Sequence, residues 1–474
     1  MSKRKTEALA LVERNAAKRD EWIEKNAFYY SQERTYMRFL VSPGASVLEL
    51  GCGTGSLLAA LEPKRGVGID LSPAMIEIAK NKHPKLNFHV GDAEDEAALG
   101  KLGGPFDFII LSDTIGWLDD CQRSLALLKP LCHRGTRVIV TYYGHIWGAM
   151  LRFAEGAGLR MPHPELNWLS SHDMMNLLDL AEFEPIKRDW RQLLPKRALG
   201  LGWLLNRYIA TLPGIRRFCL RHYIVARPAW DLPLDKPSVS VIVPCRNERG
   251  NIEPAVTRLP RLCDDVEIVY VEGGSTDGTY EECERVQAAY PDLDIKVFRQ
   301  PGKGKGDAVR KGYAEARGDI LMILDADLTV PPESLPKFYD AIASGKGEFI
   351  NGTRLVYPME SGAMRMLNYR ANRAFARIFS WLLNQRFTDT LCGTKVLRQE
   401  HYDQIAANRS YFGDFDPFGD FDLIFGAAKL NLKIVEVPIR YTDRNYGETQ
   451  ISRFSHGWLL IRMVGFAYRK LKAF

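Results

Sequence analysis

Short apolar runs alternate with helix-length amphipathic stretches along the whole chain, in two successive series. Runs of four to seven residues, bounded by Gly, Pro or Asp, predict parallel strands joined by crossover helices. We therefore expect an α/β fold with two separate sheets. The runs that we assign to strands are 46–50, 66–69, 106–111 and 137–142 in the first series, and 238–244, 266–271, 295–299 and 320–324 in the second.

A proline-rich stretch separates the two series. Pro228, Pro233 and Pro237 block the continuation of a helix or a central strand. The length of 474 residues also favours two domains over one. We predict a first domain over 1–227, a linker over 228–237 and a second domain over 238–474 that ends in an amphipathic helix.

A glycine-rich turn follows the first strand, in the sequence ValLeuGluLeuGlyCysGlyThrGly over 47–55. Glycines lack a Cβ atom, so the backbone can turn sharply there and approach a ligand closely. A dinucleotide-binding turn would have the spacing G-x-G-x-x-G, but Ser56 and Leu58 occupy the positions where the last glycine would stand. The pattern favours a nucleoside cofactor other than NAD.

Carboxylates follow the next strands of the same series. Asp70 ends the second strand, where it can accept hydrogen bonds from both hydroxyls of a ribose, and Asp92 follows the third within reach of an adenine amino group. The ordered set resembles class I S-adenosylmethionine (SAM)-dependent methyltransferases, a Rossmann-like fold, over roughly 25–227. The resemblance implies that Glu49 lies near the methionine amino group, that Asp70 holds the ribose and that Asp92 holds the adenine. The SAM-binding residues implied are Glu49, Gly51, Gly53, Gly55, Asp70, Asp92 and Asp113.

The residue that would assist methyl transfer is not fixed by this resemblance, because the family shares no single base. His145 follows a strand, and Tyr29 or Tyr30 could close over the cofactor. Each of them fits an ordinary packing role equally. A first domain that only scaffolds its neighbour is the alternative.

Two acidic residues end the fourth strand of the second series. The sequence IleLeuAspAlaAspLeuThr over 323–329 brings Asp325 and Asp327 to the carboxyl edge of the sheet. Two hard oxygen ligands there suit Mg²⁺ or Mn²⁺ bridging a diphosphate, which neutralises charge on a departing nucleotide.

The segments before and after this pair form a recognisable order. ProCysArgAsnGlu (244–248), GlyGlySerThrAspGlyThr (273–279) and GlyLysGlyAspAla (304–308) precede it, and the whole resembles family 2 inverting glycosyltransferases of the GT-A fold over 238 to about 455. AsnGlyThrArg (351–354) and AspThrLeuCysGlyThrLys (389–395) look like the branch that loads mannose or glucose onto polyprenyl phosphates. The resemblance implies nucleotide-sugar contacts at Pro244, Arg246, Glu248, Glu272, Gly273, Lys305 and Asp325, a metal on Asp325 and Asp327, and phosphate contacts at Arg354 and Arg444.

Two positions depart from that branch. Gly273 stands where a second, base-contacting carboxylate is usual, so the donor stays open between UDP- and GDP-hexoses. Gln450 stands where a lysine often follows in the last motif, so the acceptor stays open as well. A lipid phosphate needs no protein base, whereas a hydroxyl acceptor does, and Asp422 or Asp420 would then take its proton.

Charge and composition bear on where such an enzyme works. The net charge of +6 comes wholly from residues 1–230, which hold 31 basic against 25 acidic residues, and eight basic residues between 191 and 227 meet no acid in that stretch. This segment and the basic amphipathic stretches 364–387 and 456–472 could lie on an anionic membrane or be solvated helices packed on their domains.

No stretch is apolar enough to span a membrane, and the scattered cysteines favour a reduced, cytoplasmic protein that could lie on the inner membrane face. The basic residues do not form a nucleic-acid-binding module, so we expect no nucleic acid partner. The function expected is hexose transfer to a polyprenyl phosphate or glycan together with SAM-dependent methylation. The alternative is a glycosyltransferase for a soluble hydroxyl acceptor with a non-catalytic first domain.

Overall fold

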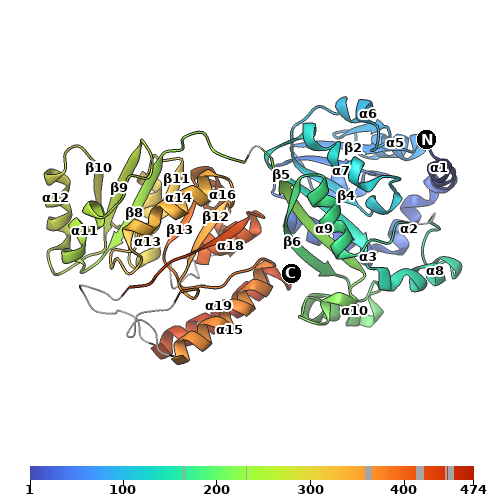
Figure 1. Cartoon of the computed structure of the whole chain (residues 1–474). Helices are drawn as coiled ribbons and strands as arrows, with labels where there is room; N and C mark the ends of the chain where they lie inside the picture. Colours follow the sequence, from blue (N-terminus) through green and yellow to red (C-terminus); the bar gives the residue numbers. More distant parts are fainter. Residues whose placement is uncertain (164–165, 231, 358–365, 413–420, 443–445, 447–452) are drawn as a thin grey trace. The chain divides into compact units, whose positions relative to one another are not determined.

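The computed structural model describes residues 1–163, 166–230, 232–357, 366–412, 421–442, 446 and 453–474. It divides into unit 1, Met1–Asp231 with Lys472–Phe474, and unit 2, Leu232–Leu471. The division falls inside the predicted linker 228–237. Each unit is a layered α/β structure, as predicted, and each is described by itself (Figure 1).

Unit 1 is built on a seven-stranded sheet. Its strands β1 to β5 are parallel, and a final antiparallel pair, β7 and β6, extends the sheet beyond β5. All four predicted strands are confirmed. The order across the sheet is β3 (Asn87–Val90), β2 (Arg65–Asp70), β1 (Ser46–Leu50), β4 (Phe106–Ser112), β5 (Cys132–Tyr143), β7 (Arg221–Pro228) and β6 (Phe183–Arg191).

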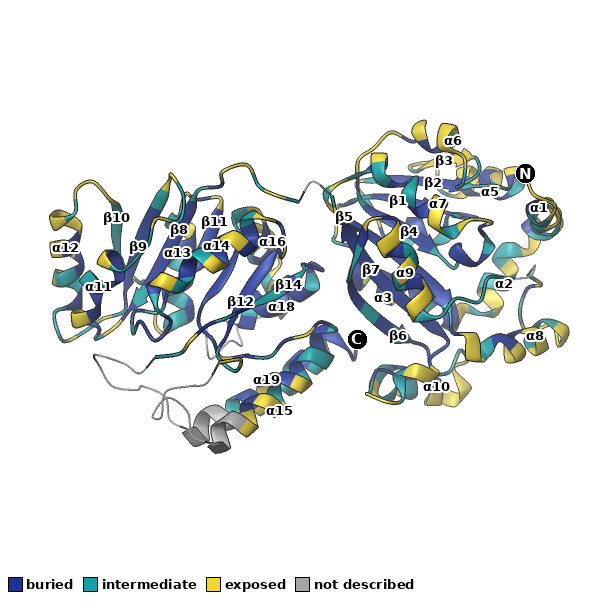
Figure 2. Ribbon diagram, in the orientation of Figure 1, coloured by how far each residue is buried: buried dark blue, intermediate teal, exposed yellow. Residues whose placement is uncertain are grey.

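Helices cover both faces of this sheet, and their outward faces carry the exposed residues while the strands are buried (Figure 2). Ser2 caps the first helix by accepting a hydrogen bond from the Lys5 amide. The helices are α1 (Lys3–Asn15), α2 (Arg19–Lys25), α3 (Ala27–Leu40), α4 (Ser56–Ala60), α5 (Pro73–Lys82), α6 (Glu96–Gly100), α7 (Cys121–Ala126), α8 (Gly148–Gly156), α9 (Ser171–Leu180) and α10 (Leu201–Leu204).

Part of the basic segment 191–227, which was predicted to lie on a membrane or on its own domain, is buried inside unit 1. Arg191, Arg221 and Arg227 lie in β6 and β7 and are buried. They form ion pairs with acids from other parts of unit 1, such as Arg227 with Glu184 and Arg191 with Asp189. These three cations are therefore unavailable to a lipid surface. The prediction counted charge along the sequence and missed the acids that the fold brings in.

Unit 2 also has a seven-stranded sheet, of mixed direction. β8, β9, β10 and β11 are parallel, whereas β13 runs antiparallel to both β11 and β12. The four predicted strands are confirmed here too. The order is β10 (Asp294–Arg299), β9 (Val266–Glu272), β8 (Val239–Cys245), β11 (Ile320–Ile323), β13 (Lys395–Arg398), β12 (Phe349–Thr353) and β14 (Ile434–Pro438).

Two long helices of unit 2, α15 and α19, run side by side (Figure 1), with the rings of Trp381 and Tyr468 5.6 Å apart. Helix α15 lies within the predicted amphipathic stretch 364–387, and α19 covers 456–471 of the predicted stretch 456–472. Among the described residues, no helix combines the length and apolar character needed to cross a membrane. The helices are α11 (Ile252–Thr257), α12 (Thr279–Ala289), α13 (Lys305–Glu315), α14 (Leu335–Ala343), α15 (Met366–Leu383), α16 (Gln399–Ala407), α17 (Arg409–Phe412), α18 (Phe421–Lys429) and α19 (Arg453–Leu471).

Candidate functional sites

Unit 1 contains a cavity of about 530 Å³ at the carboxyl edge of its sheet. The ends of β1, β2 and β4 form one side, and residues of α1, α2, α3 and α8 form the other. Six of the seven predicted SAM-binding residues line it: Glu49, Gly51, Gly53, Asp70, Asp92 and Asp113. The seventh, Gly55, does not.

The glycines of the turn serve different purposes. Gly53 has a φ of 52°, and its amide donates to Asp70 Oδ2 at 2.8 Å, which joins the turn to the end of β2. Gly55 begins α4 with a φ of 74°, and a Cβ there would lie 2.6 Å from Cζ of Phe88. Gly55 is therefore needed for the packing of the helix against β3 and not for contact with a ligand.

Two carboxyl groups lie beside the turn: Glu49 is buried, and Asp70 is partly exposed. Burial raises the pKa of Glu49 well above its usual value, and Glu49 Oε2 accepts one hydrogen bond, from the Leu58 amide. Burial also raises the pKa of Asp70, although amides of Ser72 and Gly53 donate to its two oxygens. A bound cation or hydroxyl would stabilise both carboxylates, so this pair fits the ammonium and ribose of SAM.

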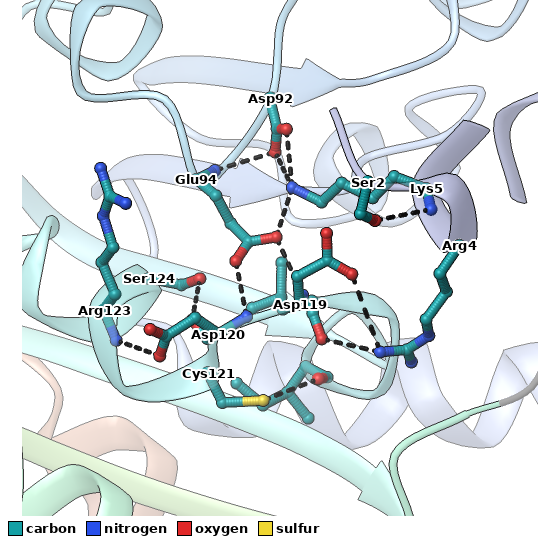
Figure 3. A network of polar contacts seen from close by, with 12 residues as sticks. Ser2, Arg4, Lys5, Asp92, Glu94, Asp119, Asp120, Cys121, Arg123 and Ser124 are labelled. Atoms are coloured by element: carbon teal, nitrogen blue, oxygen red, sulfur yellow. Dashed lines mark hydrogen bonds and ion pairs between the residues drawn. The ribbon is translucent and has the colours of Figure 1, made fainter.

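Asp92 already has a partner, Lys5 of α1 (Figure 3). The Lys5 ammonium lies 2.7 and 2.6 Å from the two oxygens of Asp92 and also pairs with Glu94. Glu94 in turn accepts from the amides of Asp119 and Asp120, in the loop after β4. The sequence analysis missed Lys5, because a lysine in a basic amino-terminal stretch is usually solvated.

Further contacts hold α1 over the cavity as a roof. Arg4 donates to the carbonyls of Gly116 and Leu118 at 2.8 and 3.2 Å, and Glu13 accepts from Ser72 after β2. Apolar residues of the same helix, including Leu9, line the cavity between these contacts. The loops after β2, β3 and β4 are thus all joined to α1.

A buried ion network lies deeper in the cavity. Arg221, with 1% of its side chain exposed, pairs with both Glu33 and Asp113. Asp113 also accepts from Thr141 Oγ1 at 3.1 Å, and the Tyr29 hydroxyl lies 3.5 Å away. The charge of Asp113 is therefore compensated by protein groups.

The three candidates for methyl transfer are placed differently. Tyr29 and Tyr30 line the cavity, in the position predicted for residues that close over a cofactor. His145 is exposed at the protein surface and does not line the cavity. Its position therefore gives no support to a catalytic role for His145 in this cavity.

In unit 2, the loops after β8 and β9 are joined at the carboxyl edge of the sheet. The amide of Gly273 donates to the Cys245 carbonyl at 2.9 Å, and the Asn247 amide donates to Ser275 Oγ. Arg246 projects to solvent beside Gly273, and Pro244 is half-buried.

The two glutamates predicted for the nucleotide sugar serve these loops. Glu248 is buried and accepts from Asn251 Nδ2 at 2.7 Å, while Glu272 is buried and accepts from the Ser275 amide. The carboxylates of Glu248 and Glu272 thus stabilise the loops that follow β8 and β9 through hydrogen bonds.

Asp325 and Asp327 follow β11, whose last residue, Ile323, pairs with Ile242 of β8. Both aspartates are partly exposed. Lys305, the first residue of α13, places its ammonium 2.7 Å from Asp325 Oδ1. Burial would raise the pKa of Asp325, but Lys305, with smaller contributions from Lys395 and Arg354, lowers it.

The other oxygen of Asp325 is close to a segment that the sequence analysis did not use. A Cβ at Gly393 would lie 1.8 Å from Asp325 Oδ2 and 2.6 Å from the Lys305 ammonium, so only glycine fits there. In the part of the chain that the structure describes, no three metal-binding side chains cluster. Asp325 and Asp327, the predicted metal ligands, both have partners in the protein: Asp325 pairs with Lys305, and Asp327 Oδ1 accepts from the amide and the hydroxyl of Thr329.

The remaining predicted residues are less open than expected. Arg354 uses Nε and Nη2 to hold Asp389, at 2.7 Å each. Asp422 Oδ2 lies 3.7 Å from Arg310 and 3.6 Å from Arg409. Asp420 and Arg444 lie outside the described residues.

Comparisons with known proteins match each unit separately. Residues 3–188 match the family described as methyltransferase domain, and residues 240–406 match glycosyl transferase family 2. A dolichyl-phosphate hexose transferase from Haloferax volcanii is 30% identical over 222 residues, 46% of this chain and 89% of that protein. A SAM-dependent methyltransferase structure from Thermotoga maritima covers 46% of this chain and 99% of its own, with 21% identity and a TM-score of 0.36.

Other relatives are matched over a smaller part of their length. A dolichol-phosphate mannosyltransferase from Pyrococcus furiosus is 40% identical over 121 residues, 25% of this chain and 33% of that protein. The chain thus spans about a third of the length of this relative.

Proposed function

Since the chain belongs to the family 2 glycosyltransferases and carries a methyltransferase domain before that fold, we propose that unit 2 transfers a hexose from a nucleoside diphosphate sugar to a polyprenyl phosphate, and that unit 1 methylates a second substrate with SAM. The observation that carries the first part is the position of Asp325 and Asp327, partly exposed after β11 beside the amino terminus of α13. Relatives whose names include dolichyl- or dolichol-phosphate transfer support the acceptor class.

The residues around Asp325 suit a diphosphate. Lys305 presents its ammonium at the first turn of α13, where backbone amides and the helix dipole also favour anions. A Mg²⁺ or Mn²⁺ ion held by Asp325 and Asp327 would neutralise the leaving diphosphate. The backbone of Gly393 packs against the Asp325 carboxylate and the Lys305 ammonium, so there is room for their ion pair only because residue 393 has no side chain.

The environment of Asp422 favours a phosphate acceptor over a hydroxyl. Its carboxylate has two guanidinium groups within 4 Å, so it is held in ion pairs with Arg310 and Arg409. Arg310 and Arg409 can instead hold a phosphate, whose oxygen is already anionic near neutral pH. The acceptor oxygen would attack the anomeric carbon opposite the diphosphate and invert its configuration.

For unit 1, the support is the cavity and its buried acids. SAM would supply an electrophilic methyl group. Glu49 would receive the methionine ammonium and Asp70 the ribose hydroxyls. Both contacts would stabilise the ionised carboxylates, whose unpaired charge is disfavoured by burial. Asp92 would orient the adenine end together with Lys5 and α1, which shield that end from water.

A direct test uses the whole chain with labelled UDP- and GDP-hexoses, polyprenyl phosphate in detergent, and Mg²⁺ or Mn²⁺. We expect lipid-extractable label with one nucleotide class, lost in Asp327→Asn and largely kept in Asp422→Asn. Asp340→Asn, at an exposed position of α14, serves as a matched control because it removes one carboxylate charge outside both motifs.

Two results would contradict parts of this proposal. Loss of transfer in Asp422→Asn would favour a hydroxyl acceptor, with Asp422 as the base. Calorimetry with S-adenosylhomocysteine that shows no binding heat would make unit 1 a scaffold without a cofactor.

A further inference from the structure

Part of the lining of the unit 1 cavity is a group of aromatic rings and arginines to which no SAM contact is assigned above. Tyr29 and Tyr30 meet edge to face, with ring centroids 5.0 Å apart, and the hydroxyls of Tyr29 and Tyr143 are 3.1 Å apart. The guanidinium carbon of Arg19 lies 5.6 Å from the Tyr30 ring centroid, and that of Arg160 lies 4.9 Å from the Tyr143 ring centroid. All five side chains line the cavity.

One of the two arginines, Arg160, keeps a buried donor that no described residue uses. Arg160 donates through Nη1 to Glu155, but its buried Nη2 has no hydrogen-bond acceptor in the described structure. Arg19 contacts the Met161 sulfur at 3.9 Å, and no described carboxylate pairs with it. A buried donor without an acceptor is costly, so the site is complete only when a ligand supplies one.

The two cations act on the same place, as His163 shows. Its Nδ1 lies against the Met161 carbonyl, and it also lines the cavity. Burial, then Arg160, then Arg19 lower the pKa of His163 to about 3. The imidazole is therefore neutral near pH 7 and adds no positive charge beside the two arginines. Glu155 is the described ion-pair partner of Arg160, whereas Arg19 lies nearer to Glu33, Glu49 and Asp70.

We propose that this region of the cavity binds the anionic group, a carboxylate or a phosphate, of the molecule that unit 1 methylates, with an apolar or aromatic part against the three tyrosines. Guanidinium forks bind both anions through paired hydrogen bonds, and tyrosine faces bind flat apolar groups. An ammonium-bearing acceptor is disfavoured, because Arg19 and Arg160 would repel it. The inference rests on the proposed methyltransferase role of unit 1.

The proposed anion site must be distinguished from binding of the cofactor's own carboxylate, and Arg160 is the residue that allows this. Arg19 lies close enough to Glu49 and Asp70 to lower the pKa of both, so it borders the cofactor end. Arg160 follows α8 and is not among the main groups that shift the pKa of either carboxyl. Its substitution therefore tests the acceptor site.

The experiment titrates the whole chain, saturated with S-adenosylhomocysteine, with benzoate, phenyl phosphate, benzyl alcohol and benzylamine in a calorimeter. We expect at least one of the two anions to bind and the neutral and cationic compounds to give no heat. Arg160→Met should weaken anion binding about tenfold or more, the effect of losing charge-assisted hydrogen bonds. Arg160→Lys should lose less, because it keeps the charge. Arg152→Met, at an exposed position of α8 outside the cavity, should bind as the unaltered chain does.

Three results would overturn the inference: no anion binds, benzyl alcohol binds as tightly as benzoate, or Arg160→Met binds like Arg152→Met. Anion binding that occurs only without S-adenosylhomocysteine would also overturn it, because the cofactor carboxylate would then be the natural occupant. If S-adenosylhomocysteine itself does not bind but the anions bind and depend on Arg160, the cofactor assignment fails and the anion site stands. Melting temperatures of all variants show whether a loss of binding reflects unfolding.

Discussion

Arg354 was expected to contact phosphate, but its surroundings predict a structural role that can be measured. Its guanidinium holds Asp389 with two hydrogen bonds of 2.7 Å, and its own amide donates to the same carboxylate at 3.1 Å. The Asp389 side chain is fully buried, and that of Arg354 is 11% exposed. Arg354 also lowers the pKa of Asp389, against the effect of burial. Arg354→Met would therefore leave a buried carboxylate with only backbone and amide donors.

The expected cost follows from that burial. Removing one partner of a buried ion pair costs about 3–5 kcal/mol of unfolding free energy, because the other charge stays desolvated. Asp389→Asn should cost a similar amount. The double variant should lose about 1–3 kcal/mol less unfolding free energy than the sum of the two single losses. Each single variant already removes the interaction between the two side chains. Arg440→Met, at an exposed position, should cost less than about 0.5 kcal/mol.

Urea unfolding monitored by hydrogen exchange of β12 and β13 peptides measures these values within unit 2. A change of under about 1 kcal/mol in Arg354→Met, together with a raised KM for the lipid phosphate, would refute the structural reasoning. The phosphate role implied by the family resemblance would then be the better account. Additive single losses would show that the two side chains do not depend on each other.

Three further predictions concern the two sites. Lys305→Met should raise the affinity of the free protein for Mn²⁺ roughly tenfold, as measured by calorimetry, because an ammonium 2.7 Å from Asp325 opposes a metal there by about 1–4 kcal/mol; an unchanged affinity would mean that the metal does not use Asp325. Lys5→Met should speed hydrogen exchange in α1 and weaken S-adenosylhomocysteine binding, by roughly 1–3 kcal/mol each, since it removes the ion pairs to the loop after β3; unaltered exchange would show that α1 is held by other contacts. Because the native His163 has a pKa of about 3 and the unfolded one about 6.5, only the unfolded chain gains a proton between those values. Unfolding free energy should therefore fall by about 2 kcal/mol from pH 7 to pH 5 relative to His163→Gln, measured by tryptophan fluorescence, and parallel pH profiles would contradict this.

Eight strands, four in each unit, were predictable because parallel strands are buried on both faces and form continuous apolar runs. The antiparallel β13, and β12 and β14 beyond it in the unit 2 sheet, were not predicted. β6 and β7 escaped prediction for a physical reason. These two strands include charged residues, such as Asp189 and Arg221, so they lack a continuous apolar run. The charges are compensated only after the chain folds. Local sequence cannot show that compensation.

The candidate sites divide in the same way. Residues at strand ends, such as Asp70 and Asp325, could be placed because the sheet fixes where its carboxyl edge lies. Lys5, Arg19 and Arg160 could not, since each comes from a helix or loop that only tertiary structure brings to the cavity. The predicted roles of site residues remain predictions until substitutions test them.

The roof formed by α1 has a consequence for how the protein is made. Arg4 and Lys5 reach partners 87 to 114 residues further along the chain, so a nascent polypeptide produces α1 before these partners and can seat it only after the loop beyond β4 has left the ribosome. Such distant pairings form late, because a long loop must close first. An adenosine-containing ligand would then bind only chains in which α1 is already seated on unit 1. Its presence during synthesis would therefore stabilise the folded unit relative to partly folded forms.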